Sequence, residues 1–310
     1  IAESQQTTQT LTGLTTGGRT GDAVVLTLNG TAYNATIDDQ GRFNVQVSTA
    51  DLIADSNKTI DASFTATKAG GNSSTIAATK VYTVDTTAPV NPGITAANVT
   101  TDNVINASES LTSDTVLSGT VSGEVRVGDV VQISLNGNTF TTTVQNGNTW
   151  SLSVPTTQLM ADSDKTFTVT VIATDAAGNS ATASTSHSYT IDTQGPTNTV
   201  VVFNKVTGDN VIDTTEAGTT STTLSGSVTG EFTAGDTLTL TINGTAYVTT
   251  VGADGSWTKS VATSDLTADA DRTIDAVLVA HDAAGNPANI NGNQRYALQG
   301  DTVLTVNTVT

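Results

Sequence analysis

Hydrophobic and polar residues alternate with a period of two over many short stretches of this chain. The clearest alternation runs through Asp129–Leu135, stops at Asn136-Gly137 and resumes in Thr139–Val144. An Asn-Gly pair between two alternating runs is the strongest short-range signal of a β-hairpin. No segment carries the 3.6-residue apolar spacing over ten or more residues that a long helix requires. The pattern therefore predicts an all-β protein.

Five further strands are expected around this hairpin. They are rich in β-branched Thr, Val and Ile, which suit a half-buried pleated surface. Seven short strands in about 107 residues, separated by frequent turn signals, predict an immunoglobulin-like β-sandwich that needs no disulfide. The further strands are expected at Ile94–Val99, Thr115–Val121, Trp150–Val154, Thr166–Ala173 and Ser184–Ile191.

The same pattern occurs three times, at an offset of 107 residues. A unit of this length is a domain in its own right, because solenoid repeats typically run about 20 to 45 residues. We therefore expect tandem sandwiches in an extended rod, named here copy 1 (residues 1–85, with its first strand missing), copy 2 (86–192) and copy 3 (193–300), followed by a tail or a further repeat at 301–310. The matching positions include Gly21-Asp22, Gly128-Asp129 and Gly235-Asp236; Phe43, Trp150 and Trp257; Gly71-Asn72, Gly178-Asn179 and Gly285-Asn286; and Tyr82, Tyr189 and Tyr296.

The recurring aromatic residues are expected to serve the fold. Phe43, Trp150 and Trp257 follow Gly-containing turns and should fill the space between the two sheets. The three tyrosines near the end of the last strand are interpreted as anchoring rings, with exposed sugar-stacking platforms as the alternative.

The amino-acid composition limits the classes of molecule that this chain is expected to bind. The 310 residues carry 29 Asp plus Glu against 11 Lys plus Arg, a net charge of −18, which argues against nucleic acid and anionic membranes as partners. No run of 18 or more apolar residues occurs, so no membrane insertion by this segment is expected, and an export signal would have to lie outside it. The absence of cysteine excludes disulfides, Cys-ligated zinc and thiol catalysis. An acidic chain without disulfides or Cys-ligated zinc suggests that bound cations stabilise the fold.

Enzyme chemistry finds little support in the sequence. The two histidines, His187 and His281, occupy different repeat positions, so each is interpreted as a lone surface residue. Carboxylate pairs of the glycosidase type lack an aromatic cleft, and no phosphate-binding glycine loop occurs. The chain is predicted not to be an enzyme.

Several segments resemble a known family, the tandem bacterial immunoglobulin-like domains of giant type I-secreted (RTX-type) adhesins and biofilm surface proteins. The resemblance rests on Thr174–Ser180 (TDAAGNS), on Tyr189–Thr193 (YTIDT) with Pro196, and on Asp102–Asn106 (DNVIN) with Glu109. It covers nearly the whole chain. It implies extender modules outside the bacterial cell, at its surface, with calcium bound at the junctions between neighbouring repeats.

The positions of the acidic residues lead to the same ion. If successive strands alternate in direction, the acids of two loops and of the entering linker meet at one end of a sandwich, where Ca²⁺, which takes about 6 to 8 oxygen ligands, would relieve their repulsion. Alternatively, Asp and Asn recur in these loops because their side chains cap turns. The expected ligands are Asp85, Glu124, Asp129 and Asp175 at the first junction and Asp192, Glu231, Asp236 and Asp282 at the second. A second pair of sites is expected at Asp102, Asn103 and Glu109 and at Asp209, Asn210 and Glu216.

Copy 1 departs from this set, with Gly17 and Lys68 where the other copies have acids, so its outer end should lack the ion although Asp22 remains. The favoured function is a monomeric, calcium-rigidified spacer whose partners are neighbouring repeats, and which projects a binding tip for adhesion or biofilm formation. The alternative is a recognition module for a glycan or a host protein. Contact loops tuned for binding should differ between copies, whereas these loops repeat their acids, which favours the spacer.

Overall fold

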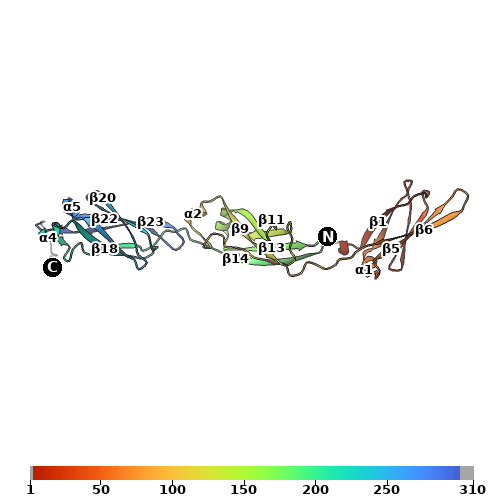
Figure 1. Cartoon of the computed structure of the whole chain (residues 1–310), viewed down its shortest axis with the longest axis horizontal. Helices are drawn as coiled ribbons and strands as arrows, with labels where there is room; N and C mark the ends of the chain where they lie inside the picture. Colours follow the sequence, from red (N-terminus) through yellow and green to blue (C-terminus); the bar gives the residue numbers. More distant parts are fainter. Residues whose placement is uncertain (1–2, 301–310) are drawn as a thin grey trace. The chain divides into compact units, whose positions relative to one another are not determined.

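The computed structural model describes residues 3–300, and it is built almost entirely of β-strands (Figure 1). The described chain groups into two compact units. One holds the residues up to Ala97 with Ser118–Leu152 and Phe167–His187, and the other holds Asn98–Leu117, Ser153–Thr166 and the residues from Ser188 onward. The predicted boundaries after residues 85 and 192 therefore remain a prediction. The tail 301–310 lies outside the described residues, as do Ile1 and Ala2.

Each copy contains a four-stranded antiparallel sheet facing a smaller sheet, the arrangement of an immunoglobulin-like sandwich. In copy 2 the sheets have the orders β11-β10-β13-β14 and β12-β9-β7, and in copy 3 β20-β19-β22-β23 and β16-β18-β21. Copy 1 has β3-β2-β5-β6 and only the pair β1-β4. The absence of a first strand from copy 1 stays a prediction.

The strand bounds follow from the alternation and the turns. In copy 1 they are β1 (Thr8–Leu14), β2 (Ala23–Leu28), β3 (Thr31–Thr36), β4 (Arg42–Ser48), β5 (Thr59–Thr67) and β6 (Ser73–Val81). In copy 2 they are β7 (Gly93–Ile94), β8 (Val104–Ile105), β9 (Asp114–Ser122), β10 (Val130–Leu135), β11 (Asn138–Thr143), β12 (Thr149–Pro155), β13 (Thr166–Thr174), β14 (Ser180–Ser188) and β15 (Thr190–Ile191). In copy 3 they are β16 (Val200–Phe203), β17 (Val211–Ile212), β18 (Ser221–Thr229), β19 (Thr237–Ile242), β20 (Thr245–Thr250), β21 (Ser256–Ala262), β22 (Thr273–His281), β23 (Pro287–Arg295) and β24 (Ala297–Leu298).

The predicted hairpin is confirmed, and its turn explains the Asn-Gly pair. β10 and β11 are antiparallel partners. Asn136 and Gly137 between them both have positive φ, 48° and 74°, as a type I′ turn requires. Asn and Gly adopt this conformation at the least steric cost, so the pair fixes the register of the strands on either side.

Two features were not predicted. Short helices of four to six residues connect strands, too short to show a helical repeat: α1 (Thr49–Ala54), α2 (Ala107–Ser110), α3 (Thr156–Ala161), α4 (Thr214–Ala217) and α5 (Thr263–Ala268), with the 3₁₀ turn η1 (Glu3–Gln5). The expected last strand is divided into β14 and β15, because β15 leaves the sheet and pairs in parallel with β8. β24 and β17 repeat this pairing in copy 3.

None of the helices in residues 3–300 has the length and apolar character of a membrane span.

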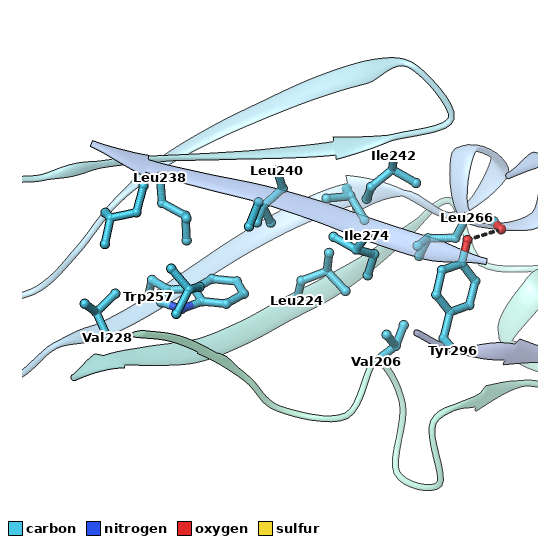
Figure 2. Close-up of a cluster of buried hydrophobic side chains, with 14 of the residues drawn as sticks. Val206, Leu224, Val228, Leu238, Leu240, Ile242, Trp257, Leu266, Ile274 and Tyr296 are labelled. Carbon is cyan, nitrogen blue, oxygen red and sulfur yellow. Dashed lines mark hydrogen bonds between the residues drawn. The ribbon is translucent and has the colours of Figure 1, made fainter. Parts of the chain in front are cut away.

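The core lies between the sheets (Figure 2). Trp150 and Trp257 are 0% and 1% exposed, as predicted, whereas Phe43 in copy 1 is only half-buried. Tyr296 is buried and donates a hydrogen bond to the carbonyl oxygen of Leu266 at 2.7 Å, and Tyr189 repeats the contact at Leu159 at 2.8 Å. The recurring tyrosines are therefore anchors within the fold.

Candidate metal centre at the linkers

The loop between β13 and β14 is hydrogen-bonded to the chain at Asp85, where copy 1 continues into copy 2; we call this stretch the first linker and the equivalent stretch at Asp192 the second. The loop and the first linker belong to the same compact unit. One carboxylate oxygen of Asp175 accepts hydrogen bonds from the backbone N–H groups of Ala177 and Asn179, both at 2.9 Å. The side-chain amide of Asn179 donates to the other oxygen of Asp175 at 2.9 Å and to the backbone carbonyl oxygen of Asp85 at 3.1 Å. Asn179 thus places a loop carboxylate and a linker carbonyl beside one amide group.

The second linker is held in the same way, inside the other compact unit. The amide of Asn286 donates to Asp282 at 3.0 Å and to the backbone carbonyl of Asp192 at 3.0 Å. Here the oxygen of the same side chain also accepts from the N–H of Ala107 at 2.7 Å. Asn286 is only 2% exposed, so its hydrogen-bonding groups are satisfied by protein.

The two glutamates fasten the linkers further along. Glu124 accepts a hydrogen bond from the N–H of Val90 at 2.7 Å. Glu231 accepts from both the N–H and the hydroxyl of Thr197, at 2.7 and 3.1 Å. Glu124 and Glu231 lie on the loops after β9 and β18. Each linker is therefore hydrogen-bonded at two places, first at its aspartate and again a few residues later.

Asp129 and Asp236 connect two loops at the same end of each sandwich. Asp129 is buried and accepts from the N–H groups of Arg126 at 2.7 Å and Thr174 at 3.1 Å. Asp236 accepts from the N–H groups of Thr233 and His281 in the same manner, at 2.7 and 3.0 Å. These contacts set the loop that precedes β10 or β19 against the strand that leads to Asp175 or Asp282.

His281 lies at the surface as interpreted, with its side chain 41% exposed, but the interpretation of it as a lone residue is wrong. Its Nδ1 lies 2.7 Å from Oδ1 of Asp236, whose side chain is 4% exposed. Burial raises the pKa of Asp236, but the N–H groups of Thr233 and His281 and the imidazole ring outweigh it, so the pKa is lowered overall. His187 is not a lone side chain either, because its ring lies 5.4 Å from that of Phe167.

The residues of the second predicted pair of sites serve turns and helix caps. Asp102 accepts from the N–H of Val104 at 3.0 Å, and this hydrogen bond is the main reason that its pKa is lowered. Asn103 accepts from Val99 N–H at 3.2 Å and donates to the carbonyl of Ser188 at 2.8 Å. In copy 3, Asp209 and Asn210 make the equivalent bonds, and the pKa of Asp209 is also lowered, chiefly by the N–H of Val211.

Glu109 and Glu216 complete capping boxes at the starts of α2 and α4. Glu109 exchanges hydrogen bonds with Asn106, and Glu216 exchanges them with Asp213. This reciprocal pattern satisfies backbone N–H groups at a helix start. Local hydrogen bonding accounts for these residue types without an ion, and calcium binding at this second pair of sites stays a prediction.

The structure therefore connects two of the four expected ligands at each linker through one asparagine amide, the carbonyl of Asp85 with the carboxylate of Asp175 and the carbonyl of Asp192 with the carboxylate of Asp282. Within residues 3–300, no three His, Cys, Asp or Glu side chains form a group with metal-binding spacing. The available donors are carboxylate, carbonyl and amide oxygens, which is the chemistry that Ca²⁺ prefers. The residue types therefore fit this ion, and the hydrogen bonds already made leave further carboxylate lone pairs.

Asn179 and Asn286, which hydrogen-bond the two linkers, are missing from the predicted ligand sets. Their repetition 107 residues apart was visible in the sequence, and Asn179 lies in the segment that carries the family resemblance, but neither residue was assigned to a linker or a ligand set. Only the structure shows that this side chain spans to a residue 94 positions earlier.

The chain is similar to bacterial immunoglobulin-like domains and to solved structures of bacterial adhesins. Residues 89–193 match the family model described as a bacterial Ig-like domain. A solved structure from a study of how a 1.5-MDa bacterial ice-binding adhesin is retained at the host cell surface is 36% identical, covers 96% of this chain and 92% of its own, and has a TM-score of 0.71. A search of curated proteins finds no match.

Two further solved structures are similar. One is described as a Ca²⁺-stabilized adhesin with which an Antarctic bacterium binds ice; it is 38% identical, covers 96% of this chain and 70% of its own, and has a TM-score of 0.70. The other is a single bacterial immunoglobulin-like domain of the M. primoryensis ice-binding adhesin, 43% identical over 32% of this chain and 95% of its own, with a TM-score of 0.30.

Proposed function

The chain belongs to the bacterial immunoglobulin-like domains of large adhesins, and on this premise we propose that it is a spacer segment in which bound calcium stiffens the linkers. The proposed spacer holds a binding region away from the surface of a bacterium and works outside the cell, as a monomer. The family supports a structural rather than an enzymatic role. In this proposal each sandwich contributes to the length of the spacer, and the stiffness of the linkers determines whether the spacer stays extended.

The observation that carries the proposal is the repeated attachment of the linker. Asn179 bonds the carbonyl of Asp85, and Asn286 bonds the carbonyl of Asp192, with the same sequence separation of 94 residues. A module that evolves for recognition can vary its loops between copies. A spacer must instead attach every linker in the same way, because its reach depends on all of them.

Calcium is the finer part of the proposal. We assign it to Asp85, Glu124, Asp129 and Asp175 at the first linker and to Asp192, Glu231, Asp236 and Asp282 at the second. The support is the set of oxygen donors at each linker and the similarity to an adhesin described as Ca²⁺-stabilized. A bound ion would supply positive charge between carboxylates that otherwise repel one another. The chain's own contribution is to hold these carboxylates through backbone N–H groups.

Small-angle X-ray scattering with and without calcium tests this function. A strand of about ten residues spans roughly 33 Å, so three sandwiches with stiff linkers should give a maximum dimension on the order of 120 Å in calcium. Chelator should broaden the distance distribution while the circular dichroism of the strands stays unchanged. A compact particle in calcium would contradict the spacer, and loss of the β signal on chelation would place the ions inside the sandwiches.

A further inference from the structure

Hydrogen bonds between neutral groups surround Asp192, the first residue of the second linker. Its N–H donates to the carbonyl oxygen of Ile105 at 3.1 Å, and its carbonyl oxygen accepts from the side-chain amide of Asn286 at 3.0 Å. The oxygen of that amide accepts from the N–H of Ala107 at 2.7 Å. Because Ile105 and Ala107 are separated by a single residue, these three bonds form a closed ring.

A fourth hydrogen bond lies beside this ring. The side-chain amide of Asn106 donates to the carbonyl oxygen of Ala284 at 3.1 Å, and Ala284 is only 7% exposed. A Cβ added at Gly285 would lie 3.9 Å from Nδ2 of Asn106, which is ordinary van der Waals contact. We call the residues that make these four bonds the linker clamp, and all of them belong to one compact unit: Ile105–Ala107, Asp192, Ala284 and Asn286.

The capping box of α2 fixes the orientation of the Asn106 amide. Oδ1 of Asn106 accepts from the N–H of Glu109 at 2.9 Å, and Oε2 of Glu109 accepts from the N–H of Asn106 at 3.0 Å. A backbone N–H can only donate, so Oδ1 faces Glu109, and Nδ2 is left to donate to the carbonyl of Ala284. One side chain therefore caps α2 and contacts the loop of copy 3.

The loop between β22 and β23 presents its acceptors in a fixed geometry. The N–H of Asp282 donates to the carbonyl oxygen of Asn286 at 3.2 Å, and the N–H of Asn286 donates to the carboxylate of Asp282 at 2.9 Å. Between them, Gly285 has a φ of 82°, a conformation that glycine adopts at the least steric cost. Because the loop is ordered by its own hydrogen bonds, little conformational entropy is lost when the linker clamp forms.

We propose that the linker clamp keeps the second linker ordered in the absence of calcium, and that Asn106 is the residue that positions α2 on the loop of copy 3. The partner surface is a tight loop that offers a backbone carbonyl and a side-chain amide oxygen to the donors of Asn106 and Ala107. The inference rests on the proposed spacer function, because it concerns how the same linker is stiffened. Calcium then adds to an order that this linker already has.

Asn106 can be replaced without loss of its cap. Asp213 occupies the equivalent position in copy 3 and forms a complete capping box with Glu216. Asp and Ser cap helices about as well as Asn. A carboxylate has no donor for the carbonyl of Ala284, and the Ser side chain ends one atom short of the Asn amide nitrogen. Asn106→Asp and Asn106→Ser therefore remove the hydrogen bond to Ala284 and keep α2.

The test is amide hydrogen exchange of the full chain in chelator, measured by NMR at the N–H groups of Ala107 and Asp192. Both groups should be protected in the unaltered chain. Loss of one neutral hydrogen bond should speed their exchange about two- to tenfold in Asn106→Asp and in Asn106→Ser. The matched control is Asp213→Asn, which alters the equivalent cap of α4 and should leave both rates unchanged. Exchange in the core strands should be the same in all four proteins.

Four results would overturn the proposal. Exchange of both N–H groups at the rate of an unstructured peptide in chelator would mean that the linker requires the ion. Unchanged rates in the two Asn106 variants would remove Asn106 from the positioning role. An effect of Asn106→Asp without one of Asn106→Ser would assign the loss to the added charge, and an equal effect of Asp213→Asn would assign it to helix capping.

The spacer function fails by a different measurement. If the linker clamp is absent, the calcium-dependent scattering can still show an extended spacer. If calcium does not change the scattering, the N–H groups of Ala107 and Asp192 can still be protected in chelator. The two experiments therefore separate failure of the linker clamp from failure of the calcium-stiffened spacer.

Discussion

Asn286 donates a hydrogen bond from its side-chain amide to the backbone carbonyl oxygen of Asp192, across 94 residues of sequence. Asn179 makes the same bond to Asp85 with the same separation. In both cases the amide also holds a carboxylate of the same loop, Asp282 or Asp175. The loop therefore cannot change its conformation without affecting the linker, and this coupling underlies the first two predictions.

Removal of the asparagine should release the linker while the sandwich stays folded. Asn179→Ala deletes the hydrogen bonds to the carbonyl of Asp85 and to the carboxylate of Asp175, of which the neutral bond to Asp85 contributes about 0.5–1.5 kcal/mol. Hydrogen exchange should become faster at Thr87 and Val90, which follow Asp85. The matched control is Asn72→Ala, the equivalent exposed residue in copy 1, which should change exchange only locally. Equal effects at residues 85–90 in both variants would contradict the linker role.

The attachment should also weaken in acid. The side-chain amide of Asn179, helped by backbone N–H groups, holds the pKa of Asp175 below its usual 3.8. A depressed folded-state pKa stabilises the loop fully above pH 3.8, and this contribution is lost as the pH falls through the lower folded value. Titration of the Asp175 carboxyl by NMR measures it directly. In Asn179→Ala the pKa should return toward 3.8, and an unchanged value would mean that the amide does not stabilise the charge.

The tyrosine anchors should limit stability in alkali. Burial, with the nearby Asp55, raises the pKa of Tyr82 to about 12 from 10.0. The stability that Tyr82 contributes is present below pH 10.0 and is lost as the pH rises toward the folded value of about 12, because the unfolded chain ionises first. Urea unfolding of the chain and of Tyr82→Phe at pH 8 and pH 11 should show a smaller pH dependence in the variant. Identical pH dependence would exclude Tyr82 as the cause.

Calcium should stabilise the second linker through Asp192. A ligand at a hundredfold excess over its Kd stabilises by about 2.7 kcal/mol, and loss of one charged ligand should remove much of this. The calcium-dependent rise in Tm should therefore shrink in Asp192→Ala. Asp275→Ala removes an exposed acid from β22, away from the linker, and is the matched control. His281 cannot serve as that control because it contacts Asp236. Equal calcium responses in the two Asp variants would leave the acids as turn residues only.

Some side-chain contacts between repeat positions cannot be recognised from the sequence, even though the positions recur in every copy. Tyr247 donates a hydrogen bond to Asp265 at 2.5 Å, and Tyr33 donates likewise to Asp51 in copy 1. Copy 2 has Phe140 and Gln158 at these two positions, so both members of the pair change together. Each substitution by itself looks like ordinary drift. Only the contact explains why they occur in the same copy.

The sequence by itself determined the fold class, the three copies and most strands, because period-two alternation and Asn-Gly turns are local properties of the chain. The tertiary structure decided the rest. The parallel pairing of β8 with β15 joins residues about 86 positions apart, and the attachment of Asp85 by Asn179 has no local signature. Asp175, Asp102 and Glu109 serve turns and caps, and their spacing cannot distinguish that role from ion binding, because the same carboxylate oxygens suit both backbone N–H groups and Ca²⁺.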